Sequence, residues 1–206
     1  MSTCASQTGR RHIETTPSIA IADILAPLLT RTEITEVVVE FDAHIPDASD
    51  SDFSRLVAAW PRLRRFSLSY LKSYATGLIT YREVPTFTTV IAFAERCPAL
   101  RTLDLFALDV EDTLDVRSVP ALNHQALRSM EVGMLFGGEE VNLFDLAAIV
   151  DLVFPHLEVP HEATMAATFS TKHKWDWRAW HVTTVLVGAI RRRRTLAHGT
   201  TGGSPK

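Results

Sequence analysis

Residues 53–69 read FSRLVAAWPRLRRFSLS and contain a predicted helix followed by a predicted strand. The first half places apolar side chains at i, i+3, i+4 and i+7, the stripe of an amphipathic helix: Phe53, Leu56, Val57 and Trp60. Pro61 ends this helix, because proline disfavours a helical conformation in the residue before it. The residues that follow read apolar-x-x-apolar-x-apolar, which predicts a strand. We expect Asp50 or Ser51 to cap the helix.

The same apolar spacing recurs along the chain. Segments that read apolar-x-x-apolar-x-apolar begin at four positions 27 to 37 residues apart: Ile34, Leu63, Leu100 and Leu127. Leu157 begins a fifth, degenerate segment 30 residues after the fourth. Three of these starts follow a proline by two residues, in Trp60-Pro61, Cys97-Pro98 and Phe154-Pro155. A period of this kind indicates repeated strand–loop–helix units.

Helices are expected between most of the strands. The apolar spacing predicts helices over residues 87–97 and 144–153, whereas residues 109–125 have no helical period and are expected to form a loop. A right-handed crossover returns each strand to the same edge of a parallel sheet. We therefore predict an α/β fold, namely a short leucine-rich-repeat solenoid with a parallel concave sheet and helices on the convex side.

The predicted domain spans residues 19–190 and comprises about five units. Residues 19–29 and 175–190 are expected to cover its two ends as helices, because a stack of repeats needs covers. Residues 1–18 are expected to be a disordered N-terminal segment, and residues 191–206 a basic, glycine-rich disordered tail.

Composition excludes several protein classes. The chain has 206 residues, 46% hydrophobic and 22% charged, which is typical of one globular domain and excludes full-length disorder. A net charge of −3 is unlike that of a nucleic-acid-binding protein. Two cysteines cannot build a disulfide scaffold, and the longest apolar stretch near the C-terminus is too short to cross a membrane. We predict a cytoplasmic or nuclear protein that binds neither nucleic acid nor membrane.

No motif for catalysis, for a cofactor or for a metal is present. The chain lacks GxSxG, HExxH and the phosphate-loop pattern, and Cys97 lies on an apolar helix face where it is expected to pack. The pairs His156 with His161, and His173 with His181, do not have the spacing of a zinc site. We therefore predict no enzyme activity, no cofactor and no metal.

The sequence contains a run of four consecutive positive charges, Arg191 to Arg194. Two interpretations remain open. The arginines can mark the C-terminus of a helix, where cations interact favourably with the helix dipole. They can also form a nuclear-import signal or a contact with an acidic surface.

The proline corners resemble a known family. Ala59-Trp60-Pro61-Arg62-Leu63, and likewise residues 97–100 and 154–157, are similar to the aWPxLxxL signature of fungal F-box proteins of the basidiomycete type. The resemblance implies the leucine-rich-repeat half, which recognises substrates in ubiquitin-ligase complexes. No F-box-like segment precedes Ile21, so contact with the ligase adaptor is expected only if an F-box lies outside this chain. The alternatives are a truncated or orphan repeat domain without a ligase role, or a ligand-binding α/β domain.

Residues between the apolar positions are expected to project from the concave face, because side chains alternate along a strand. The candidate partner-binding residues lie in three rows: Glu36, Arg65, Thr102 and Ser129 in the first, Ser67, Asp104 and Glu131 in the second, and Phe106 in the third. Asp104 and Glu131 would place like charges on adjacent strands, which costs stability unless a base of a partner meets them. Phe106 would be an apolar anchor beside them. We expect the partner to be a protein substrate; the alternative is a set of solvated strand residues without a partner.

Overall fold

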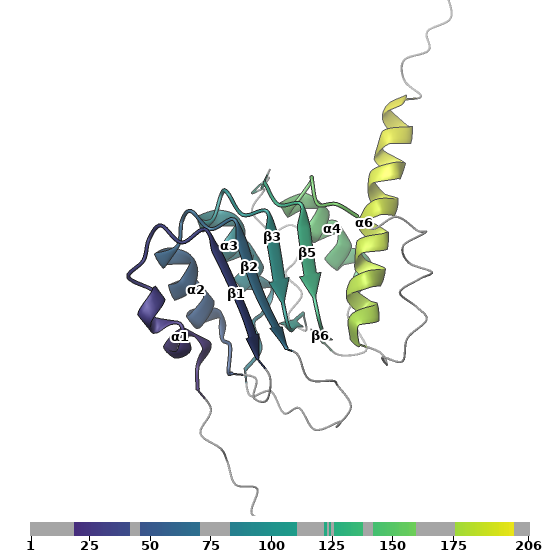
Figure 1. Ribbon diagram of the computed structural model, residues 1–206. Helices are drawn as coiled ribbons and strands as arrows, with labels where there is room; N and C mark the ends of the chain where they lie inside the picture. Colours follow the sequence, from purple (N-terminus) through teal and green to yellow (C-terminus); the bar gives the residue numbers. More distant parts are fainter. Residues whose placement is uncertain are drawn as a thin grey trace, which may run out of the picture.

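The computed structural model describes residues 19–41, 46–70, 83–110, 122, 124, 126–137, 142–159 and 176–199 of the chain. Four strands form one sheet in the order β1-β2-β3-β5, and all neighbours are parallel (Figure 1). They are β1 Glu36–Phe41, β2 Arg65–Tyr70, β3 Thr102–Leu105 and β5 Ser129–Val132. The order in space follows the order in the chain. The predicted α/β class and the predicted parallel sheet are confirmed.

Three helices pack on one side of this sheet (Figure 1). They are α2 Asp50–Ala59, α3 Phe87–Arg96 and α4 Leu143–Val153. Each lies where the apolar spacing predicted a helix. After β3, the short strand β4 Leu108–Asp109 pairs in parallel with β6 Leu135–Phe136 to form a second, two-stranded sheet. Most of the loop predicted over residues 109–125 lies outside the described residues.

The predicted apolar positions form the contact layer between the sheet and the helices. One residue of each strand lies in register across the sheet, and none of the four is more than 5% exposed: Val37, Phe66, Leu103 and Met130. The leucines that begin the second to fifth segments are buried as well: Leu63, Leu100, Leu127 and Leu157. Burial of this apolar surface is the main favourable contribution to folding.

In the turns that precede β2, β3 and β5, one side chain donates a hydrogen bond to a backbone carbonyl of the preceding repeat unit. Trp60 Nε1 donates to the Leu28 carbonyl at 3.1 Å, and the Cys97 thiol donates to the Trp60 carbonyl at 3.6 Å. His124 Nδ1 accepts from the backbone N–H of Leu127, so Nε2 carries the hydrogen and donates to the Cys97 carbonyl at 2.9 Å. These bonds join successive units and satisfy carbonyl groups that are turned away from water.

Burial raises the pKa of the Cys97 thiol to about 12, against a smaller lowering by the neighbouring Arg96. The thiol therefore stays protonated at neutral pH, as its hydrogen bond to the Trp60 carbonyl requires. Cys4 is the other cysteine of the chain, and replacing it with serine leaves Cys97 as the one thiol. In this Cys4→Ser variant, we expect Cys97 to resist iodoacetamide until the protein unfolds, because the thiolate is the reacting species. Mass spectrometry of protein labelled along a urea series checks this, and rapid labelling without urea would contradict it.

The same pKa shift predicts how stability depends on pH. The thiol has a pKa of 9.0 in the unfolded chain and of about 12 in the folded protein. Between these values the folded state holds one proton more than the unfolded state, so the free energy of unfolding falls as pH rises. We expect this fall to be smaller in Cys97→Ala, which lacks the titrating group. Urea unfolding of both proteins at pH 8 and pH 10 measures the difference.

The N-terminus of α2 is capped by Ser49 rather than by Asp50 or Ser51 as the sequence predicted. The backbone N–H of Asp52 donates to Ser49 Oγ at 3.3 Å, and the Asp52 carboxylate accepts from the Ser49 N–H at 3.1 Å. This reciprocal pair is a capping box, which satisfies two backbone donors at the start of the helix.

Asp50 connects α2 to the start of α3 instead. Its carboxylate accepts from the backbone N–H of Thr86 at 2.9 Å and from the hydroxyls of Thr86 and Thr89 at 2.7 and 2.6 Å. Hydrogen bonds to a charged acceptor are stronger than neutral ones. The first residue of one helix thereby anchors the next helix.

Helical segments lie at both ends of the sheet (Figure 1). At the β5 end, α6 Asp176–Gly199 passes beside the edge strand, and Trp180 Nε1 donates to the Met130 carbonyl of β5 at 3.2 Å. At the other end, α1 Ile21–Ile24 is followed by the 3-10 helix η1 Ala26–Leu28, which contains Pro27 near its N-terminus. These segments extend the helix layer, because α1 packs against α2. The expected helical segments at residues 19–29 and 175–190 are thus present where the structure describes them.

The C-terminal helix is longer than the sequence predicted. Residues 191–199 belong to α6, whereas a disordered tail was expected from residue 191. Within this extension, Arg191 and Arg194 bind Asp151 of α4. No described helix, α6 included, is long and apolar enough to cross a membrane. The predictions for residues 1–18 and 200–206 concern parts of the chain outside the described residues.

Candidate protein-binding face of the sheet

The sheet face opposite α2, α3 and α4 carries most of the residues that the sequence singled out. The strand register aligns the first predicted row across all four strands: Glu36, Arg65, Thr102 and Ser129. It aligns the second row in the same way: Val38, Ser67, Asp104 and Glu131. We call these two rows the open face, because no described helix lies over them (Figure 1).

The open face places two carboxylates on adjacent strands. Asp104 of β3 and Glu131 of β5 are direct partners in the register; Asp104 is half-buried and Glu131 is exposed. Among the described residues, no side chain forms an ion pair with either carboxylate. Like charges directly opposite each other on neighbouring strands are destabilising. The arrangement therefore carries a cost within the described structure that a cationic partner group would relieve.

The first row is mixed in charge. Glu36 and Arg65 are register partners of opposite sign, and both are exposed. Thr102 and Ser129 continue the row with half-buried hydroxyl groups. This row offers a partner hydrogen-bonding groups of both signs without a like-charge pair.

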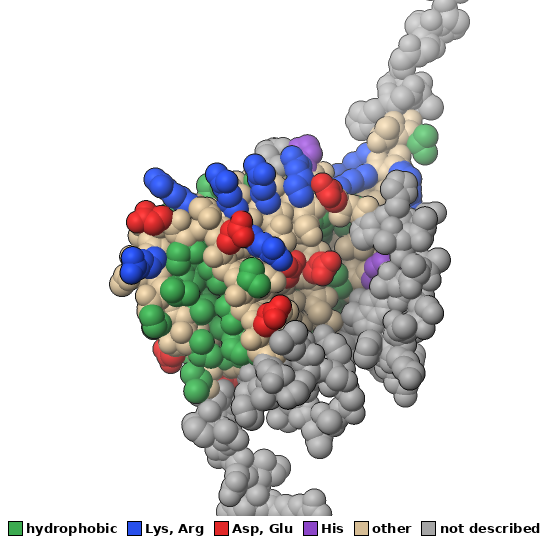
Figure 2. Space-filling model, viewed as in Figure 1, with side chains coloured by type: hydrophobic (Ala, Val, Ile, Leu, Met, Phe, Trp, Pro, Cys, Tyr) green, Lys and Arg blue, Asp and Glu red, His purple; other side chains and the backbone are tan. Residues whose placement is uncertain are grey.

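Ser67 and Val38 differ in what they offer a partner. Ser67 lies between Val38 and Asp104 in the second row and is only 7% exposed, so its neighbours shield it. Val38 lies in the same row, in register with Ser67, but was not among the predicted binding residues. It is 51% exposed and supplies apolar surface. Figure 2 shows hydrophobic side chains gathered on the β1 side of the face and acidic ones across its middle.

The prediction that Phe106 is an apolar anchor on this face is wrong. Phe106 follows the last residue of β3 and is 6% exposed, as a member of the hydrophobic core. The alternation ends there, because the chain leaves β3 after Leu105 and the next three residues are all buried. Gly133 lies against the same backbone, since a Cβ at Gly133 would come within 2.6 Å of the Phe106 carbonyl oxygen. Phe106 therefore does not form a third row of exposed residues on this side of the sheet.

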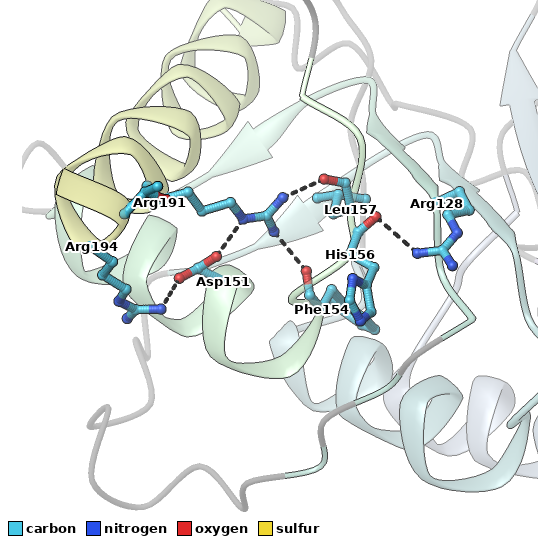
Figure 3. Close-up of polar contacts among 8 residues, drawn as sticks. Arg128, Asp151, Phe154, His156, Leu157, Arg191 and Arg194 are labelled. Atoms are coloured by element: carbon cyan, nitrogen blue, oxygen red, sulfur yellow. Dashed lines mark hydrogen bonds and ion pairs between the residues drawn. The ribbon is translucent and has the colours of Figure 1, made fainter. Parts of the chain in front are cut away.

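The arginine run has an internal partner that the sequence did not reveal. Arg191 donates from Nε to the Asp151 carboxylate at 2.6 Å and from its two terminal nitrogens to the carbonyls of Leu157 and Phe154, at 2.5 and 2.8 Å (Figure 3). Arg194 donates to the other Asp151 oxygen at 2.5 Å. The Asp151 side chain is 2% exposed. Two of the four arginines thus hold α6 against α4.

The open face presents polar and charged side chains and one valine. Among the described residues, no three His, Cys, Asp or Glu side chains lie close enough to hold a metal ion. His161 and His173, one member of each histidine pair in the sequence, lie outside the part of the chain that the structure describes. Carboxylates, one guanidinium, hydroxyls and a valine suit recognition of a polar protein surface.

Comparisons with protein-family models, with curated proteins and with solved structures find no match for this chain. The function of this chain is therefore inferred from the geometry of the open face.

Proposed function

We propose that this chain is a leucine-rich-repeat-type solenoid that acts as a protein-interaction module, with the open face as its recognition surface. The adjacent carboxylates of Asp104 and Glu131 carry the proposal, because they form no ion pair with a described residue. A partner that presents a lysine or arginine to this pair removes the repulsion on binding. Recognition of a protein substrate requires no catalytic group, cofactor or metal.

Three features support the solenoid. Strand order in space equals strand order in the chain, and neighbouring strands are parallel and in register. Side chains at the corners of three units donate hydrogen bonds to the unit before them. Stacked repeats that contact mainly their neighbours have these properties.

The resemblance of the proline corners to fungal F-box proteins extends the proposal. In that family the repeat half recognises the substrate of a ubiquitin ligase, and we assign the same role to the open face. Contact with the ligase adaptor belongs to this proposal only if an F-box lies outside this chain. Binding of the purified chain to the adaptor without any F-box would contradict the assignment.

Charge reversal at the like-charge pair tests the recognition surface. We expect Asp104→Lys to raise the free energy of unfolding by about 0.2–1 kcal/mol, because a lysine opposite Glu131 replaces repulsion with attraction. We expect the double variant Asp104→Lys, Glu131→Lys to retain the fold, and to lose the proteins that the unchanged chain captures from cell extract. Urea unfolding measures the first effect, and quantitative mass spectrometry of captured proteins measures the second.

A matched control distinguishes an effect of charges on the open face from an effect of the net charge of the protein. Asp23→Lys with Glu95→Lys makes the same charge change at exposed positions in α1 and α3, away from the open face. This control is expected to capture the same proteins as the unchanged chain. If the open-face variant is folded and its captured set is also unchanged, the open face is not the recognition surface.

A further inference from the structure

An arginine stands at the same place before each of three neighbouring strands. Arg64, Arg101 and Arg128 directly precede β2, β3 and β5. Their backbones are aligned, since the Arg101 N–H donates to the Arg64 carbonyl at 2.7 Å and the Arg128 N–H donates to the Arg101 carbonyl at 2.9 Å. We call these three residues the arginine rim. Figure 2 shows basic side chains in a row along the upper border of the face, where the strands begin.

The guanidinium groups of the rim are largely free to bind. All three residues are exposed. Among the described residues, Arg64 and Arg101 form no side-chain hydrogen bond or ion pair, and Arg128 donates only to the His156 carbonyl at 3.3 Å. Three like charges in a row on neighbouring strands are unfavourable without a counter-charge. The rim is therefore a second set of like charges, opposite in sign to Asp104 and Glu131.

We propose that the arginine rim binds an acidic helical segment of the protein that the open face recognises. This inference rests on the proposed function and adds the chemistry of the partner. Arginine suits carboxylates, because its planar fork can donate two parallel hydrogen bonds to one carboxylate. Neighbouring strands lie about 4.8 Å apart, so the three arginines are anchored over about 10 Å.

The spacing of the rim favours a helix as the acidic element. Acidic residues at i, i+4 and i+7 of a helix share one face and span about 10 Å along its axis. Three side chains on one face of an extended strand would span about 14 Å, which exceeds the rim. A helix laid across the strand ends can therefore present one carboxylate to each arginine.

The acidic residues beside the rim argue against nucleic acid as the ligand. Asp104 and Glu131 lie on the open face, on two of the strands that the arginines precede, and Glu36 lies on the neighbouring strand β1. A nucleic acid carries phosphates along its whole length, and those beyond the rim would meet these carboxylates. A protein segment can place an acidic stripe against the rim and a basic or neutral stripe against the open face.

The test uses a defined peptide as the probe. A fluorescein-labelled, alanine-rich peptide of 18 residues carries glutamate at i, i+4 and i+7, and its binding to the full chain is followed by fluorescence anisotropy at low salt. We expect the triple variant Arg64→Gln, Arg101→Gln, Arg128→Gln to bind about tenfold more weakly, as the loss of three exposed charge contacts predicts. Added salt should weaken binding to the unchanged chain, because it screens exposed charges.

A control triple variant removes three exposed arginines elsewhere: Arg55→Gln, Arg96→Gln and Arg193→Gln. It is expected to bind the peptide as the unchanged chain does. A peptide of the same composition with its glutamates spread around the helix is expected to bind more weakly. Circular dichroism and urea midpoints show that all variants are folded.

Three results would overturn the proposal. They are no measurable binding of the peptide to the unchanged chain, equal loss in the two triple variants, and tighter arginine-dependent binding of an oligothymidylate than of the peptide. The last result would assign the rim to nucleic acid. None of them concerns capture through Asp104 and Glu131, so this inference and the proposed function fail separately.

Discussion

Arg191→Met is expected to lower the free energy of unfolding by about 3 kcal/mol, the low end of the range for breaking a buried ion pair. The Asp151 side chain is 2% exposed, and it would lose the hydrogen bond from Arg191 Nε at 2.6 Å. The carbonyls of Phe154 and Leu157 would lose their donors as well. Methionine keeps an unbranched apolar side chain about as long as the aliphatic part of arginine, so the loss reports mainly the polar contacts. Urea unfolding followed by circular dichroism measures it.

The neighbouring arginine provides the control. Arg193 is exposed, and Arg193→Met is expected to change stability by less than about 0.5 kcal/mol. Asp151→Leu combined with Arg191→Met should recover much of the loss, because well-packed apolar residues can replace a buried ion pair. Equal effects at positions 191 and 193 would show that Arg191 does not hold α6 to α4.

Phe66→Ala is expected to lower the free energy of unfolding by about 3–5 kcal/mol, the usual range for truncating a buried phenylalanine. Phe66 of β2 is 0% exposed. Its ring centroid lies 5.1 Å from that of Phe93 in α3 and 5.9 Å from that of Phe53 in α2. The side chain therefore joins one strand to two helices, and its removal leaves a cavity where three elements meet.

Phe144→Ala makes the same chemical change at an exposed position. Phe144 is 53% exposed on α4, so its truncation removes little buried surface. We expect a loss below about 1 kcal/mol, since the exposed ring contributes little apolar burial. Calorimetry or urea unfolding compares the two variants. Similar losses would mean that the cluster around Phe66 is not part of the cooperative core.

Much of the fold could be predicted from spacing alone. The period of apolar residues predicted the positions of three helices, and the alternation within each strand predicted which residues share a row. The register then aligned Glu36 with Arg65 and Asp104 with Glu131 as expected. Such predictions succeed because burial acts on every unit in the same way, so the same pattern recurs in the sequence.

Part of the candidate site could not be predicted in this way. Strand alternation predicted that Phe106 projects from the same side of the sheet as the open face. Alternation does not show where a strand ends, and β3 ends at Leu105. The arginine rim was visible in the sequence only as single arginines at the starts of three strands. Its meaning depends on the alignment of those strands in space.

Local periods of side chains were enough to predict the α/β class, the parallel strand order and the two rows of the open face. Which polar residues meet depends on how the chain folds in space. Asp50 binds a threonine 36 residues away, and Asp151 binds arginines 40 and 43 residues away. Charge and hydrogen bonding act over a few ångströms in space, so a pair distant in the chain leaves no periodic trace in the sequence.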